Sequence, residues 1–126
     1  MRITTVAVIG AGTMGAGIAQ VCAQAGWKTN LYDAFPEGLE RGMERITSFW
    51  EKGIARGKTT EDQKKEWSAN LYPVGELKAA VVEADLVIEA VPEIPELKHN
   101  IFAEIDQHAP KPVSYTHLTL PTNHDV

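Results

Sequence analysis

The feature that most constrains this chain is a glycine-rich segment that directly follows an apolar run near its start. The run covers residues 6–9, and the next six residues read G-x-G-x-x-G, at the point where a buried strand would turn into a helix. Each glycine has its own expected role: Gly10 permits a tight turn, Gly12 lets the backbone approach a diphosphate, and Gly15 lets the helix pack closely on the strand. The free N–H groups at the start of that helix favour an anion. The pattern therefore predicts a dinucleotide held by Gly10, Ala11, Gly12, Thr13, Met14 and Gly15.

The residues after this segment have the spacing of a dinucleotide-binding βαβ unit. An apolar stripe with helical periodicity comes first, then Gly26, and then a second predicted strand over residues 28–32; the stripe consists of Met14, Ile18, Val21, Cys22 and Ala25. Asp33 ends this unit 18 residues beyond Gly15, where such units carry the acid that binds the adenosine ribose. No Arg or Lys occurs over residues 34–40 to attract a 2′-phosphate. We therefore expect NAD rather than NADP.

The remaining pattern predicts an α/β fold with a Rossmann-like, doubly wound parallel sheet that is incomplete and has extra helices after its second strand. A long helix is expected from Pro36, with Leu39, Met43, Ile46, Phe49 and Trp50 on its buried side. Thr60 and Gln63 have capping-box spacing and predict the start of a second helix. A strand over 70–73, a short helix over 76–82, an apolar strand over 86–91 beside the first strand, and a helix from Pro95 complete the prediction.

Composition limits the function classes. The 126 residues suffice for one core, and the formal net charge of −5 argues against a nucleic-acid surface. The sequence contains no apolar stretch long enough for a membrane span and no secretory signal at its start, so we expect a cytoplasmic protein. Cys22 is the only cysteine, and the four histidines lack the spacing of metal ligands. No metal site is predicted.

Several segments together resemble the NAD-binding domain of the 3-hydroxyacyl-CoA dehydrogenase family over about residues 2–112. They are VIGAGTMGAGIAQVCAQAG, LYD, ADLVIEAVPE followed by LK, and IFAEID. The resemblance implies that Glu93 and Lys98 contact the cofactor near the nicotinamide ribose, with backbone from Ala90 and Val91 alongside. It also implies that a serine and basic residues of the long helix hold coenzyme A phosphates, for which Ser48, Lys52 and Arg56 are candidates. A solvated basic face is an equally good interpretation of these three residues.

The same resemblance implies an enzyme, in the complete protein a homodimer, that oxidises the 3-hydroxyl of an acyl-CoA to a ketone in fatty acid or butanoate metabolism. Hydride passes to NAD while a histidine paired with a glutamate removes the hydroxyl proton. In relatives those catalytic residues lie beyond the matched segment, so none is assigned here, and this chain alone is expected to be inactive. A gulonate-type sugar-acid dehydrogenase and a non-catalytic dinucleotide-binding module remain alternatives. A downstream N-T-S-S and H-F-F-N-P-like segment would favour the acyl-CoA enzyme.

The last residues do not follow the family pattern. Residues 113–122 read VSYTHLTLPT, which is identical to one translated frame of a transposon-end sequencing adapter. We therefore predict a native domain over 1–112 and a non-native read-through tail over 113–126, with a natural divergent tail as the alternative. Because the second half of the doubly wound sheet would then be missing, we also expect an uncovered apolar strand edge, against which the tail could pair only by accident.

Overall fold

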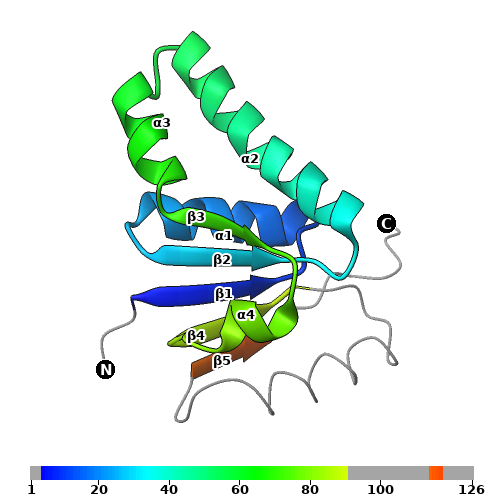
Figure 1. The fold of residues 1–126 in the computed structure, drawn as a ribbon. Coiled ribbons are helices and arrows are strands. Elements are labelled where there is room, and N and C mark those ends of the chain that lie inside the picture. The colour runs from blue at the N-terminus through cyan, green and yellow to red at the C-terminus, as the bar shows by residue number, and fades with distance from the viewer. Residues whose placement is uncertain (1–3, 91–113, 118–126) are drawn as a thin grey trace.

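The computed structural model describes residues 4–90 and 114–117 and contains a five-stranded parallel sheet with helices on both faces (Figure 1). The elements in chain order are β1 Thr5–Ile9, α1 Thr13–Gln24, β2 Lys28–Tyr32, α2 Pro36–Ala55, α3 Glu61–Ser68, β3 Leu71–Val74, α4 Leu77–Val81, β4 Leu86–Glu89 and β5 Ser114–His117. The strand order is β3-β2-β1-β4-β5, and every neighbouring pair is parallel. The α/β Rossmann-like prediction is confirmed, including the position of β4 beside β1.

The central strand β1 is buried on both faces, which explains its uninterrupted apolar sequence. Val6 and Val8 belong to the core under α1 and α2, whereas Ala7 and Ile9 belong to the core under α4. This alternation follows from the two-residue period of a strand. Because these strands are parallel, the carboxyl ends of β1, β2 and β4 reach the same edge of the sheet, where the glycine segment begins. None of the helices among the described residues is long and apolar enough to cross a membrane.

Helix α1 has the predicted start but a different buried face. Its buried residues are Gly15, Ala16, Ala19, Cys22 and Ala23. Val21, predicted on the buried stripe, is 63% exposed, and Ala25 is also exposed. The sequence-based stripe was wrong at these positions because close packing against the sheet selects small side chains, which a search for large apolar residues overlooks.

Helices α2 and α3 follow their predicted signals closely. Pro36 lies in the first turn of α2, while Ile46 and Trp50 are almost fully buried. Phe49 was predicted on the buried side but is 60% exposed, so that prediction was wrong. The Thr60 hydroxyl accepts the Gln63 N–H, and the Gln63 side chain accepts the Thr60 N–H, which confirms the capping box.

The outer edge of β4, which we expected to be uncovered unless the tail paired with it, is covered by that tail in the structure. Ser114–His117 pairs with β4 in parallel, with Leu86 opposite Ser114 and Glu89 opposite His117. The backbone of this segment thus satisfies the ladder groups that an open edge would expose. The end of the predicted strand at Val91 and the predicted helix from Pro95 lie outside the described residues.

Asp85 fastens the start of β1 to the turn before β4. Its Oδ2 accepts hydrogen bonds from the Thr4 N–H, the Thr4 hydroxyl and the Thr5 N–H, each at 3.0 Å. These bonds, first from the Thr4 backbone and then from the Thr5 backbone and the Thr4 side chain, lower the pKa of Asp85 from its ordinary value. The charged form is therefore favoured by folding.

We expect Asp85→Ala to lower the melting temperature at neutral pH. Because the folded pKa is lowered, this stabilisation is present above the carboxyl's ordinary pKa and is lost as pH falls through the lowered folded value. Thermal melts of both proteins from pH 7 to about pH 2.5 should therefore show the difference shrinking toward the acid end, below an ordinary Asp pKa of about 3.9. Asp85→Asn keeps an acceptor oxygen without the charge, so its melting temperature at neutral pH should lie between those of the wild type and Asp85→Ala. A difference that grows with acidity would contradict this account.

Candidate cofactor site

The glycine loop between β1 and α1 has the geometry that its sequence predicts. Gly10 has a φ of 110°, a backbone conformation that strains other residues, and its N–H donates to the Tyr32 carbonyl at 2.7 Å. A Cβ added to Gly15 would lie 1.6 Å from the Gly10 carbonyl oxygen. Both glycines are therefore required by the protein's own packing, one for the turn and the other for the approach of α1.

Gly12 differs from its two neighbours because the fold itself does not require a glycine there. It caps α1 with a φ of −71° and a ψ of −166°, an extended backbone that ordinary residues adopt. A Cβ at this position would meet no described atom within 4 Å, apart from those of its immediate chain neighbours and its own helix. The open space lies at the start of α1, where no side chain caps the helix and the first turn carries no acid. This space suits an anionic group that approaches the backbone closely.

Asp33 follows β2 and lies against the glycine loop. Its Oδ2 accepts the N–H of Ala11 at 2.8 Å, and its Oδ1 accepts the N–H of Phe35 at 2.9 Å. Each carboxylate oxygen has two lone pairs, so both retain capacity for a hydroxyl donor. Gly38 leaves room for this carboxylate, since a Cβ there would lie only 3.0 Å from Oδ1. The structure thus brings the predicted ribose acid to the predicted diphosphate loop.

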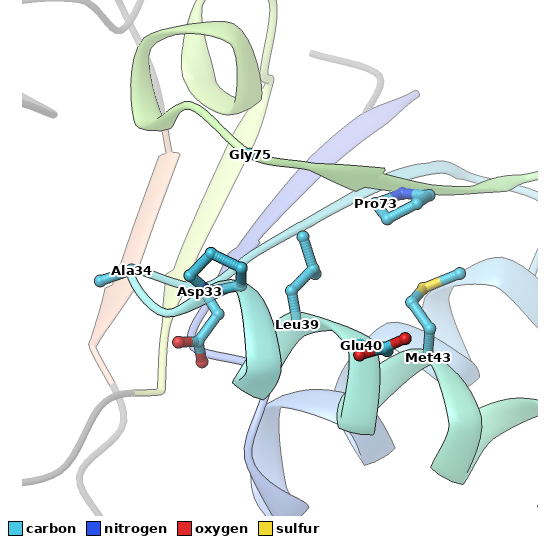
Figure 2. A pocket seen from close by; sticks show the side chains of 8 residues that line it. Asp33, Ala34, Leu39, Glu40, Met43, Pro73 and Gly75 are labelled. Atoms are coloured by element: carbon cyan, nitrogen blue, oxygen red, sulfur yellow. The ribbon is translucent and has the colours of Figure 1, made fainter.

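A pocket of about 460 Å³ opens beside Asp33, between the start of α2 and the end of β3 (Figure 2). Its size is within the range of small-molecule sites. The lining is mainly apolar and comprises Asp33, Ala34, Pro36, Leu39, Glu40, Met43, Pro73 and Gly75. Sequence reasoning identified only Asp33 among them. Leu39 and Met43 also pack against the core under α2, as their helical spacing predicted, and in addition line this pocket.

The predicted part of the site that follows β4 is described only at its first residue. Ala90 is buried, and its N–H donates to the Ile9 carbonyl at 2.8 Å. It lies beside the glycine loop, because its Cβ would be 3.7 Å from a Cβ on Gly15. Val91, Glu93 and Lys98 lie outside the described residues, so their cofactor contacts stay predictions.

The predicted coenzyme A residues lie on a different part of α2. Ser48 and Lys52 are in its second half, and Arg56 caps its end. Ser48 is half-buried, while Lys52 and Arg56 are exposed. Nothing in the described residues brings these side chains to the glycine loop, and their role stays a prediction.

The geometry of the glycine loop and Asp33 agrees with the comparisons with known proteins. The model of the 3-hydroxyacyl-CoA dehydrogenase NAD-binding domain matches residues 5–115. The chain belongs to this family. It is 41% identical over 110 residues to 3-hydroxyadipyl-CoA dehydrogenase of Escherichia coli, covering 87% of this chain and 23% of that protein. It is 36% identical over 110 residues to a probable 3-hydroxybutyryl-CoA dehydrogenase of Bacillus subtilis, covering 87% and 38%.

A solved structure supports the same assignment at the level of the fold. The crystal structure of 3-hydroxybutyryl-CoA dehydrogenase from Escherichia coli K12 superposes with a TM-score of 0.86 and 39% identity, covering 93% of this chain and 25% of that one. The chain therefore spans well under half the length of these dehydrogenases. It corresponds to their NAD-binding domain, and the resemblance based on the sequence segments is confirmed.

Proposed function

We propose that this chain is the NAD-binding part of an enzyme that oxidises 3-hydroxyacyl-CoA thioesters to 3-oxoacyl-CoA. The observation that carries the proposal is the open space at Gly12, where neither strain nor crowding by the described residues calls for a glycine. A bound dinucleotide gives that glycine a function. The names of the relatives supply the acyl-CoA class of substrate.

In this proposal the cofactor lies across the carboxyl ends of the strands. The loop from Gly10 to Gly15 binds the diphosphate at the start of α1, and Asp33 accepts hydroxyls of the adenosine ribose. The apolar pocket beside Asp33 accommodates the adenosine end. NAD, when bound, supplies a nicotinamide C4 that accepts hydride from the substrate. All four histidines lie beyond residue 90, so the described residues up to that point orient the cofactor and contain no histidine base.

The finer parts of the proposal rest on the family. They are acyl-CoA phosphate binding by Ser48, Lys52 and Arg56, a homodimeric complete protein, and a cytoplasmic location. Two measurements test the core of the proposal. Purified 126-residue chain should quench or enhance NADH fluorescence saturably, and the complete reading frame should oxidise NADH with acetoacetyl-CoA. If the chain does not bind NADH, the proposal that it is an NAD-binding domain is overturned. If the complete protein does not oxidise NADH with acetoacetyl-CoA, the proposed reaction is overturned.

Asp33 predicts a clear preference between cofactors. The wild-type chain should bind NADH more tightly than NADPH, because the carboxylate accepts ribose hydroxyls and repels a 2′-phosphate. Asp33→Ala should weaken NADH by about tenfold, the value of one charge-assisted hydrogen bond, and leave NADPH nearly unchanged. Titrations of NADH and NADPH against the wild type and Asp33→Ala measure the ratio of the two affinities in each protein. Asp33→Asn, which keeps a side-chain oxygen for Ala11, is the matched control for effects on the loop. Equal wild-type affinities would contradict the ribose assignment.

The boundary of the native domain is a separate proposal. The family model extends to residue 115, three residues beyond our predicted boundary, and β5 pairs with β4 in parallel, as the other strands of the sheet do. The identity of residues 113–122 to a translated adapter supports read-through from residue 113. Resequencing an independent clone tests this directly. Native codons continuing after VSYTHLTLPT would overturn it.

A further inference from the structure

Arg45 of α2 reaches the glycine loop from outside the sequence motif. Its Nη1 donates to the Thr13 hydroxyl oxygen at 3.0 Å, and Thr13 is the first residue of α1. The backbone of α2 is held close by Gly42, where a Cβ would lie 2.6 Å from the Ala11 carbonyl oxygen. Arg45 follows Gly42 by three residues and so leaves the helix on nearly the same side. The approach of its guanidinium to the loop is therefore built into the packing of α2.

The charge of Arg45 is not neutralised by the described part of the chain. Within residues 4–90 no carboxylate forms an ion pair with it; the ion pair found there joins Lys64 and Glu51. A guanidinium has five N–H donors, and the bond to Thr13 uses one. The Thr13 oxygen accepts that bond, which leaves its own proton to donate elsewhere. Arg45 and Thr13 together thus present several donors and one positive charge beside the open space at Gly12.

We propose that Arg45 binds the diphosphate of the dinucleotide together with Thr13 and the first turn of α1. The inference rests on the proposed function and extends the site from the glycine loop to the second helix. Charge-assisted bonds from a guanidinium to phosphate oxygens are the strong, directional kind. The alternative recipient of this charge, a 2′-phosphate, belongs beside Asp33 and Gly38. Gly38 precedes Arg45 by seven residues, or roughly 10 Å along the helix axis.

The test compares ligands that contain or lack the diphosphate. Kd values for NADH, ADP-ribose and adenosine are measured by NMR titration with the wild-type chain, Arg45→Gln and Arg45→Lys. Arg45→Gln should weaken NADH and ADP-ribose by about tenfold and leave adenosine unchanged. Arg45→Lys, which keeps the charge but not the paired N–H donors of the guanidinium, should bind NADH and ADP-ribose roughly threefold more weakly than the wild type. Added salt should weaken NADH less in Arg45→Gln than in the wild type.

Controls separate a ligand contact from a structural role. Lys65→Gln removes the same charge from the exposed face of α3 and should leave all three affinities unchanged. Thr13→Val combined with Arg45→Gln should be less damaging than the sum of the single changes, since the two side chains act as a pair. The melting temperature of Arg45→Gln should stay near that of the wild type, because an exposed side-chain pair contributes little to stability.

Four outcomes would overturn the inference. Equal loss for adenosine and ADP-ribose with a lower melting temperature would make Arg45 a brace between α1 and α2. NADPH and coenzyme A are titrated alongside, and loss confined to either of them would assign Arg45 to another phosphate. Unchanged NADH binding in Arg45→Gln would remove Arg45 from the site while leaving the proposed function intact, whereas no NADH binding by the wild type would overturn both.

Discussion

Gly15→Ala should leave the chain unable to reach its native fold. The added Cβ would lie 1.6 Å from the Gly10 carbonyl oxygen and 2.8 Å from its carbon, both backbone atoms of the turn after β1. Neither partner can rotate away as a side chain could, so α1 must move off the sheet. Because this breaks the packing of the small residues of α1 against the sheet, we expect the free energy of unfolding to fall by more than about 4 kcal/mol, which is extreme for a single substitution. Circular dichroism during thermal and urea unfolding measures it.

A glycine two positions further along the same helix supplies the control. A Cβ on Gly17 would meet no described atom outside its own helix within 4 Å. Gly17→Ala should therefore stabilise the chain by up to about 1 kcal/mol, the intrinsic helix preference for alanine over glycine. Opposite signs for the two substitutions would demonstrate the close contact at Gly15. A Gly15→Ala protein with a native melting curve would show that α1 packs elsewhere.

Gly12→Val should have the converse effect, preserving the fold while removing the cofactor. The extended backbone of Gly12 is one that ordinary residues adopt, and a Cβ at this position would meet no described atom within 4 Å outside its neighbours. Because valine is a poorer N-cap residue than glycine, the unfolding free energy should fall, but by no more than about 1 kcal/mol. The isopropyl group would occupy the diphosphate's place, so the charge-assisted bonds at the start of α1 would be lost and NADH affinity should fall by more than about a hundredfold. Paired melting and fluorescence titration experiments measure both effects.

For this interpretation to hold, Gly12→Val must lose NADH affinity while its melting behaviour stays close to that of the wild type. Gly17→Ala should bind NADH normally, because its added methyl group lies outside the loop. If Gly12→Val bound NADH as tightly as the wild type, the diphosphate would not pass over Gly12. If it unfolded, the space at Gly12 would be filled by a part of the chain beyond the described residues.

The glycine loop and Asp33 were predictable from sequence because each position there meets one dominant demand. Gly10 needs a positive φ, Gly15 needs contact without a Cβ, and Asp33 has a fixed spacing from both. The same holds for Thr60 and Gln63, whose capping bonds are local in the chain. Sequence patterns predict such features well, since the interactions lie within one turn or one βαβ unit.

Other features depended on how elements meet in space. The buried face of α1 is set by how closely the helix lies on the sheet, so alanines replace the larger residues that periodicity favours, and Val21 is exposed. The pocket uses Leu39 and Met43 of α2 together with Pro73 of β3, and no local pattern links these two segments. Arg45 reaches Thr13 across 32 positions of sequence. Predicting such contacts requires the helix-to-loop packing that Gly42 permits.

The bond between Asp33 and Ala11 limits how the cofactor preference of this domain could be redesigned. An exchange of the acid for a small neutral residue, with an arginine introduced nearby, is the obvious route to an enzyme that uses a 2′-phosphorylated cofactor. Here it would also strand the N–H of Ala11, a residue only 1% exposed, at a cost of about 1–3 kcal/mol. A successful redesign therefore has to place another acceptor, such as a serine or asparagine oxygen, at the same point. The side chain at position 33 therefore determines both the cofactor preference and the hydrogen bonding of the glycine loop.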